Sequence, residues 1–216
     1  MRAADRLRIT EIFYSLQGES RPVGLPTVFI RLTGCPLRCV YCDTQYAFHG
    51  GESMAIDDIL AQVGAFKTNL VCVTGGEPLA QPNCRALLTR LADMGYEVSL
   101  ETSGAIDIGD IDRRTAIVMD IKTPESGEVE RNRWENLAAL KPTDQLKFVI
   151  SSRDDYDWAR QVIDERGLLA RCPILFSPAW GLGIDADLAD WILADQLAVR
   201  FQIQLHKVLW GDQPGR

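Results

Sequence analysis

Short runs of apolar and β-branched residues recur along the chain and predict strands. The runs lie at 27–33, 70–74, 96–101, 116–121, 145–150, 173–177 and 200–205. Several are apolar throughout, which is typical of strands that are covered on both faces. Between some of them, apolar residues at helical spacing predict helices over 56–66, 84–94, 152–163 and about 185–198. Ser152 and Asp155 resemble a capping box at the start of the third helix.

This alternation of strands and helices implies a mostly parallel sheet with crossover helices. The six or seven predicted strands are too few for an eight-unit barrel, which typically needs about 250 residues. The segments 102–115 and 122–144 are too short or too polar for full helices, so we expect some crossovers to be loops. The sequence therefore predicts an α/β fold, a partial βα barrel of about six parallel strands with shortened crossovers, in one domain over residues 1–216.

Composition and charge narrow the class of protein. With 46% hydrophobic and 25% charged residues, the chain has the composition of a folded globular protein. Its 23 basic and 30 acidic side chains give a net charge of −7, which is unfavourable for general nucleic-acid binding. No apolar run reaches the roughly 18 residues of a membrane span, and the first residues lack the pattern of a signal peptide. We expect a cytoplasmic protein with neither a nucleic-acid nor a membrane partner.

Three of the six cysteines are crowded into one loop after the first predicted strand. Cys35, Cys39 and Cys42 follow a C-x3-C-x2-C spacing, and disulfides are not expected in the cytosol. Thiolates this close can bind one metal ion or an iron–sulfur cluster. A structural zinc would need a fourth ligand, for which His49 is available. A 4Fe–4S cluster on three cysteines leaves one iron open for chemistry. The spacing by itself permits both interpretations.

A second motif favours the cluster. Tyr41 directly precedes the third cysteine, and Thr74-Gly-Gly-Glu-Pro78 follows the next predicted strand. These two motifs in this order resemble the radical S-adenosylmethionine superfamily. The resemblance implies a 4Fe–4S cluster on the three cysteines and S-adenosylmethionine on its fourth iron. One electron then cleaves S-adenosylmethionine to a 5′-deoxyadenosyl radical.

The resemblance extends from about residue 8 to residue 210 and narrows to one family. The segments that carry it are EIFYSLQGE, GCPLRCVYCDT, CVTGGEP, LETSG, MDIKTP, LKFVI and QLHKVLW. They are similar to the 7-carboxy-7-deazaguanine synthase family, with Ser20 standing where that family more often has glycine. The resemblance implies ring contraction of 6-carboxy-5,6,7,8-tetrahydropterin to 7-carboxy-7-deazaguanine with release of ammonia, on the path to queuosine. It also implies Mg²⁺, a homodimer, and an electron donor of the flavodoxin or ferredoxin type.

The same resemblance assigns the site residues. To the S-adenosylmethionine site it assigns Tyr41, Cys42, Asp43, Gly76, Glu77, Ser103, Asp120, Ile121, Lys122, Ser177, Pro178, Ala179 and Trp180. To the substrate site it assigns Leu16, Gln17, Gly18, Glu19, Arg31 and Thr74. Thr44 would help bind Mg²⁺, an ion that prefers oxygen ligands. Many of these residues follow predicted strands, where ligands of parallel sheets bind.

Simpler roles and other functions remain open at this point. On the sequence alone, Thr44 can cap a turn and Arg31 can form a strand-end ion pair. We expect residues 8–50 to carry the substrate and cluster loops, residues 51–210 to form the remaining core, and His206 to be a structural residue in a strand. One alternative is another small radical enzyme, such as a glycyl-radical activase. The other is a non-catalytic zinc-binding domain, which predicts a colourless protein.

Overall fold

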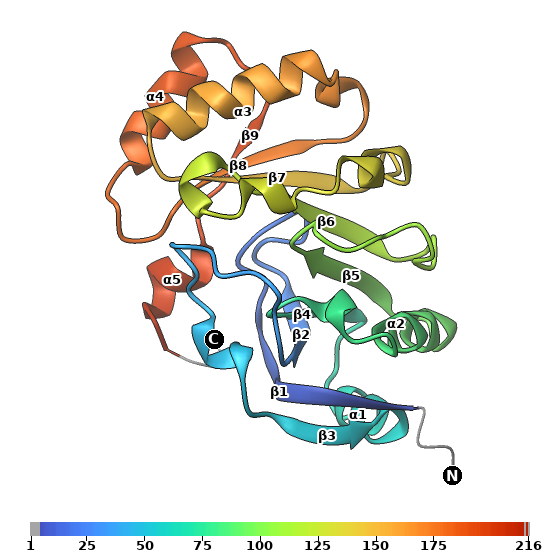
Figure 1. Ribbon diagram of the computed structural model, residues 1–216. Coiled ribbons are helices and arrows are strands. Elements are labelled where there is room, and N and C mark those ends of the chain that lie inside the picture. Colours follow the sequence, from blue (N-terminus) through green and yellow to red (C-terminus); the bar gives the residue numbers. More distant parts are fainter. Residues whose placement is uncertain (1–4, 214, 216) are drawn as a thin grey trace.

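The computed structural model describes residues 5–213 and 215, and Figure 1 shows their arrangement. Within these residues the strands form one nine-stranded sheet, in the order β3-β1-β2-β4-β5-β6-β7-β8-β9. The strands are β1 (Arg6–Leu16), β2 (Pro26–Leu32), β3 (Glu52–Ala55), β4 (Leu70–Gly75), β5 (Glu97–Thr102), β6 (Ala116–Ile121), β7 (Gln145–Ile150), β8 (Ile174–Pro178) and β9 (Arg200–Phe201). Pairing is parallel from β2 to β9, whereas β1 pairs antiparallel with β2 and β3. The sheet is open, which confirms the predicted partial barrel.

The predicted helices are present, some with different ends. The helices are α1 (Ile56–Val63), α2 (Cys84–Asp93), α3 (Arg153–Glu165), α4 (Asp185–Ala194) and α5 (Leu205–Trp210). The Ser152 hydroxyl accepts a hydrogen bond of 3.2 Å from the Asp155 amide, so the predicted cap of α3 is confirmed. The segments 103–115 and 122–144 contain turns and short 3₁₀ helices, as expected for shortened crossovers. Among the described residues, no helix combines the length and apolar character that crossing a membrane requires.

Three local expectations are wrong. Met94 was expected in the apolar face of α2, but it caps the helix end and is 54% exposed, because the chain turns at Gly95 with a φ of 87°. The run 200–205 is a strand only at its first two residues, Arg200–Phe201, so His206 lies on α5 rather than in a strand. The long strand β1 was not expected. Buried Leu7 and Ile9 alternate there with exposed neighbours, which is the signal of a half-buried strand.

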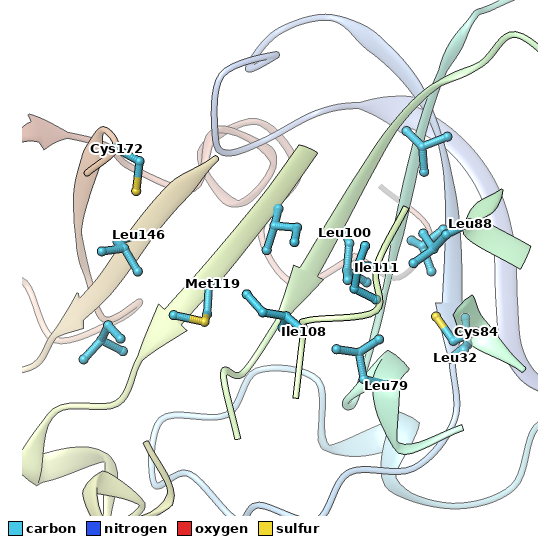
Figure 2. Packing of buried hydrophobic residues seen from close by; sticks show 14 of the residues in the cluster. Leu32, Leu79, Cys84, Leu88, Leu100, Ile108, Ile111, Met119, Leu146 and Cys172 are labelled. Carbon is cyan, nitrogen blue, oxygen red and sulfur yellow. The ribbon is translucent and has the colours of Figure 1, made fainter. Parts of the chain in front are cut away.

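The core lies between the sheet and the helices. Figure 2 shows Leu100, Met119 and Leu146 on the neighbouring strands β5, β6 and β7, all part of one buried cluster. Ile108 and Ile111, from the loop after β5, pack on this face where a crossover helix is missing. Successive strand residues point to opposite faces, so the residues next to these core positions face the other side of the sheet. That side carries the site.

A strained residue follows the N-terminal strand. Ser20 has a φ of 63°, in the left-handed region, and is 1% exposed. Its amide donates a hydrogen bond of 2.6 Å to Gln202 Oε1, whereas its hydroxyl is buried without a partner among the described residues.

Replacing Ser20 with glycine is expected to raise the free energy of unfolding by about 1 kcal/mol, because it relieves the left-handed strain and the unpaired hydroxyl at a smaller cost in unfolded-chain entropy. Urea unfolding of the two proteins measures the difference. Ser20→Ala separates the two causes, since alanine keeps the strained φ and loses only the hydroxyl. A Ser20→Gly protein less stable than the native one would contradict this explanation.

Residues 1–4, 214 and 216 lie outside the described residues, so the assignment of 1–216 to one domain stays a prediction, as does its division into 8–50 and 51–210.

Candidate active site

A cleft lies on the face of the sheet opposite the core cluster. Its walls come from the substrate segment (Leu16–Glu19), the cysteine loop (34–44), the ends of the parallel strands, and α5. In Figure 1 the blue and cyan N-terminal segments and the red α5 lie together on this side, and the Leu205 amide donates to the Gly18 carbonyl at 3.0 Å. The predicted site residues that line the cleft are Leu16, Gln17, Gly18, Glu19, Arg31, Cys35, Cys39, Tyr41, Cys42, Asp43, Thr44, Thr74, Gly76, Ser103, Asp120, Lys122, Ser177, Pro178, Ala179 and Trp180.

The three clustered cysteines line one end of this cleft as half-buried free thiols. Burial raises the pKa of each thiol, so binding of a metal to the thiolates releases protons. Among the described residues, no three His, Cys, Asp or Glu side chains are arranged around one metal ion. His49 is exposed and does not line the cleft. His49 is therefore not placed as the fourth ligand that a structural zinc would take, whereas a cluster with one open iron needs only the three cysteines.

Glycines let the Thr74–Pro78 turn approach the cysteine loop. A Cβ on Gly76 would lie 2.3 Å from the Gly34 carbonyl oxygen and 2.8 Å from Cys35 Cβ. The Glu77 amide donates a hydrogen bond of 2.8 Å to that same carbonyl. The turn and the loop are therefore packed backbone to backbone, with no room for a side chain. The half-buried thiols and this close packing fit a cluster bound in the cleft.

Two predicted cofactor residues do not line the cleft. Ile121 is 3% exposed and belongs to the core. Glu77 is fully buried, and its carboxylate accepts hydrogen bonds from the Thr102 hydroxyl at 2.9 Å and from the Ser103 amide at 2.7 Å. The Leu79 amide also donates to it, at 2.9 Å. Glu77 thus positions Ser103, which does line the cleft, at the end of β5.

A chain of charged side chains crosses the cleft floor from β6 to the substrate segment. Lys122 Nζ lies 2.8 Å from Asp120 Oδ2, and Lys147 Nζ lies 3.4 Å from Asp120 Oδ1. Lys147 also contacts Glu19 Oε2 at 2.8 Å. Burial acts to raise the pKa of Asp120, but the two ammonium groups outweigh it and the pKa is lowered. Asp120 therefore stays ionised beside them.

A buried carboxylate joins the predicted substrate residues. Glu101 Oε2 accepts a hydrogen bond of 3.0 Å from the Thr74 hydroxyl, and Oε1 accepts one of 3.4 Å from Gln17 Nε2. Burial raises the pKa of Glu101, and the Lys147 ammonium opposes this increase. The sequence interpretation gave no role to Glu101 or Lys147. Lys147 is a charged residue inside a largely apolar run, LKFVI, and that signal could have identified it, whereas Glu101 stands in the mixed pattern EVSLET, which gives no such signal.

Arg31 makes the ion pair that the sequence alone suggested, whereas the Thr44 side chain makes no capping hydrogen bond to the following 3₁₀ turn. Arg31 Nε donates to Glu11 Oε1 at 2.7 Å, so the strand ion pair exists and lies in the cleft wall. The Thr44 hydroxyl donates to Asp43 Oδ1 at 2.7 Å. Tyr41 lines the cleft too, and burial raises the pKa of its phenol to about 12.

α5 brings His206 into the cleft, where no site residue was expected from this part of the chain. A Cβ on Gly18 would lie 2.0 Å from His206 Nδ1, so any larger residue in the substrate segment at this position would displace the imidazole. Burial lowers the pKa of His206, against the opposing influence of Glu19 and Asp43. Gln204 bridges the same two acids, donating to Glu19 Oε1 at 2.9 Å and to Asp43 Oδ2 at 3.1 Å.

Comparison with known proteins places the chain in a family. The model of the radical SAM superfamily matches residues 29–119. The 7-carboxy-7-deazaguanine synthase of Chlorobaculum tepidum is 45% identical, over 95% of this chain and 94% of that protein. The enzyme of the same name from Koribacter versatilis is 43% identical, over 94% and 97% of the two chains. The crystal structure of QueE from Escherichia coli has the same fold, with a TM-score of 0.70 at 24% identity over 93% of this chain and 95% of that one. With such identities over nearly its whole length, the chain belongs to the 7-carboxy-7-deazaguanine synthase family of radical S-adenosylmethionine enzymes.

Proposed function

We propose that this protein converts 6-carboxy-5,6,7,8-tetrahydropterin to 7-carboxy-7-deazaguanine with release of ammonia, a ring contraction used in queuosine biosynthesis. The observation that carries the proposal is the shared cleft. The clustered cysteines, the Thr74–Pro78 turn and the substrate segment meet there, although they are separate in sequence. A zinc-binding domain has no need for this combination, and a glycyl-radical activase has no need for the substrate segment.

In this proposal Cys35, Cys39 and Cys42 hold a 4Fe–4S cluster at one end of the cleft. When bound, the cluster and S-adenosylmethionine supply a 5′-deoxyadenosyl radical, which is the difficult chemistry of the reaction. The protein binds, orients and excludes water. Ser103 and Lys122 offer a hydroxyl and an ammonium group on one wall, and both suit the amino-acid end of S-adenosylmethionine. Tyr41 and Trp180 offer ring surface for the adenine.

The substrate occupies the side of the cleft nearer β2 and β4 in this proposal. Gln17 presents an amide and Glu19 a carboxylate, which match the donor and acceptor edge of a pterin. Arg31, oriented by Glu11, suits the substrate carboxylate. We place Mg²⁺ at Thr44, next to the Asp43 carboxylate, since this ion prefers oxygen ligands and retains waters or substrate oxygens.

The proposal also includes the partners and the location of the enzyme. A flavodoxin or ferredoxin-type protein supplies the electron, and the enzyme works as a homodimer in the cytoplasm. The net charge of −7 supports a function without a nucleic-acid partner.

Anaerobic turnover tests the function. The protein is reconstituted with iron and sulfide and supplied with S-adenosylmethionine, dithionite, Mg²⁺ and the carboxytetrahydropterin, and products are followed by mass spectrometry. We expect 7-carboxy-7-deazaguanine and ammonia to form with dithionite as the electron source and with no partner protein present. Cleavage of S-adenosylmethionine without this product would show a radical enzyme with another substrate. A zinc protein without a cluster would contradict the proposal entirely.

A further inference from the structure

Lys147 is a buried cation at the centre of the cleft floor. It lies on β7 between two core residues, Leu146 and Phe148, and its side chain is 13% exposed. Burying an ammonium group is costly unless acidic partners compensate. Lys147 has such partners on two elements, since it contacts Glu19 of the substrate segment at 2.8 Å and Asp120 of β6 at 3.4 Å.

These two partners depend on Lys147 to different degrees. Asp120 has a closer cation in Lys122, at 2.8 Å. Glu19 has no second cation within ion-pair distance among residues 5–213 and 215, and its other oxygen accepts from the neutral amide of Gln204. Loss of the Lys147 charge would therefore affect Glu19 more than Asp120. The substrate segment would lose its main electrostatic attachment to the sheet.

Acidic and basic groups surround Lys147. The charged and titratable groups that face it or its neighbours are Asp120 on β6, Lys122 directly after β6, Glu101 on β5, Arg31 on β2, Glu19 in the substrate segment, Asp43 in the cysteine loop, and His206 and Lys207 on α5. The Lys147 ammonium favours the ionised form of Glu101, against the effect of burial. Without it, the pKa of Glu101 must rise, because the carboxylate loses the positive charge that most opposes the effect of burial.

We propose that Lys147 is a positioning residue that holds Glu19 in the cleft and joins the substrate segment to Asp120, the partner of the Lys122 ammonium that we assign to S-adenosylmethionine. The inference rests on the proposed function, because it assigns Glu19 to the substrate. Lys147 acts through the carboxylates and need not touch the substrate itself. Removal of the Lys147 charge should weaken binding of the pterin more than binding of S-adenosylmethionine, because Asp120 still has Lys122 as an ion-pair partner.

Lys147→Met removes the charge at similar side-chain length and is the main test. Pterin and S-adenosylmethionine binding are measured separately by calorimetry on the reconstituted protein, together with KM and kcat. We expect the Kd and KM for the pterin to rise at least about 30-fold at neutral pH, as when one partner of a buried charge pair is removed. The Kd for S-adenosylmethionine should change less than about threefold, which is small for a lost contact. Lys147→Arg should restore much of the pterin affinity.

The pH dependence distinguishes positioning from a merely structural role. In Lys147→Met the Glu101 carboxylate, which accepts hydrogen bonds from Thr74 and Gln17, titrates at higher pH than in the native protein. Raising the pH ionises Glu101 again, so the defect in pterin affinity should shrink between pH 7 and pH 9. A matched control is Lys141→Met, which removes another buried lysine paired with an acid, Asp144 at 2.7 Å. This control should leave both affinities near their native values.

The outcomes separate this inference from the proposed function. Equal losses of pterin and S-adenosylmethionine affinity without recovery at high pH would overturn the positioning role, as would unchanged pterin affinity. If the native protein binds the pterin but makes no 7-carboxy-7-deazaguanine, the function fails. A selective, pH-dependent binding defect in Lys147→Met would then still support the role of Lys147.

Discussion

Replacing Cys39 with alanine is expected to abolish product formation, with a loss of at least about 1,000-fold, because the cofactor rather than the protein supplies the reactive chemistry. Cys39 lines the cleft with Cys35 and Cys42, and a cluster on two cysteines would be lost or unstable. The measurements are the iron and sulfide content after reconstitution and the rate of product formation. Both should fall together.

Two control variants make this result specific. Cys172 is 6% exposed within the core cluster, away from the cleft residues, so Cys172→Ala should keep its iron and its activity. His49 is the fourth ligand in the zinc interpretation, but it is exposed and outside the cleft lining, so His49→Ala should also behave like the native protein. Loss of bound metal in His49→Ala would contradict the cluster assignment, as would a Cys39→Ala protein with full iron content.

The second large effect is expected at Gly76. A methyl group there would lie 2.3 Å from the Gly34 carbonyl oxygen and 2.8 Å from Cys35 Cβ, so the cysteine loop or the turn must shift. A displacement of about 1 Å near reacting groups can cost on the order of 100-fold in rate, so Gly76→Ala should lose at least that much activity. Iron content and circular dichroism are measured alongside the rate, to show whether the folded protein retains a cluster.

A glycine elsewhere provides the matched control. Gly64 ends α1 with a φ of −65°, and a Cβ there would be 3.4 Å from its nearest neighbour, the Leu60 carbonyl oxygen. Gly64→Ala should therefore fold and turn over normally. If Gly76→Ala also keeps full activity, the close packing of the turn against the cysteine loop is not needed for turnover, and the prediction is wrong.

Much of the fold could be predicted because the central strands are rich in apolar and β-branched residues and are separated by helical patterns. The strands at 116–121 and 145–150 were located to the residue, and the open parallel sheet followed from the alternation of elements. β1 escaped prediction because its pattern is mixed in its second half, where Glu11, Tyr14 and Ser15 interrupt the apolar positions. Parallel strands require long crossovers, whereas this antiparallel strand joins β2 through a loop that the alternation rule does not describe.

The sequence indicated most of the residues that line the cleft, but it did not indicate which of these residues contact one another. Motif position alone brought most of the assigned residues into one cleft, as the ends of parallel strands require. It could not show that Glu77 turns inward to hold Ser103, or that Lys147 reaches Glu19. Such pairs are formed by residues distant in sequence and depend on strand register. His206 was misplaced because the chain leaves the sheet after Phe201 and begins α5 at Leu205.

Electron paramagnetic resonance of the reconstituted, dithionite-reduced protein, before and after addition of S-adenosylmethionine and then of the pterin, tests most directly whether one cleft holds the cluster and both ligands. If a three-cysteine cluster, S-adenosylmethionine and the pterin are in mutual contact there, a reduced 4Fe–4S cluster gives a signal that changes when S-adenosylmethionine is added and changes again with the pterin. A colourless, signal-free protein with bound zinc, or a cluster signal indifferent to S-adenosylmethionine, would contradict this arrangement.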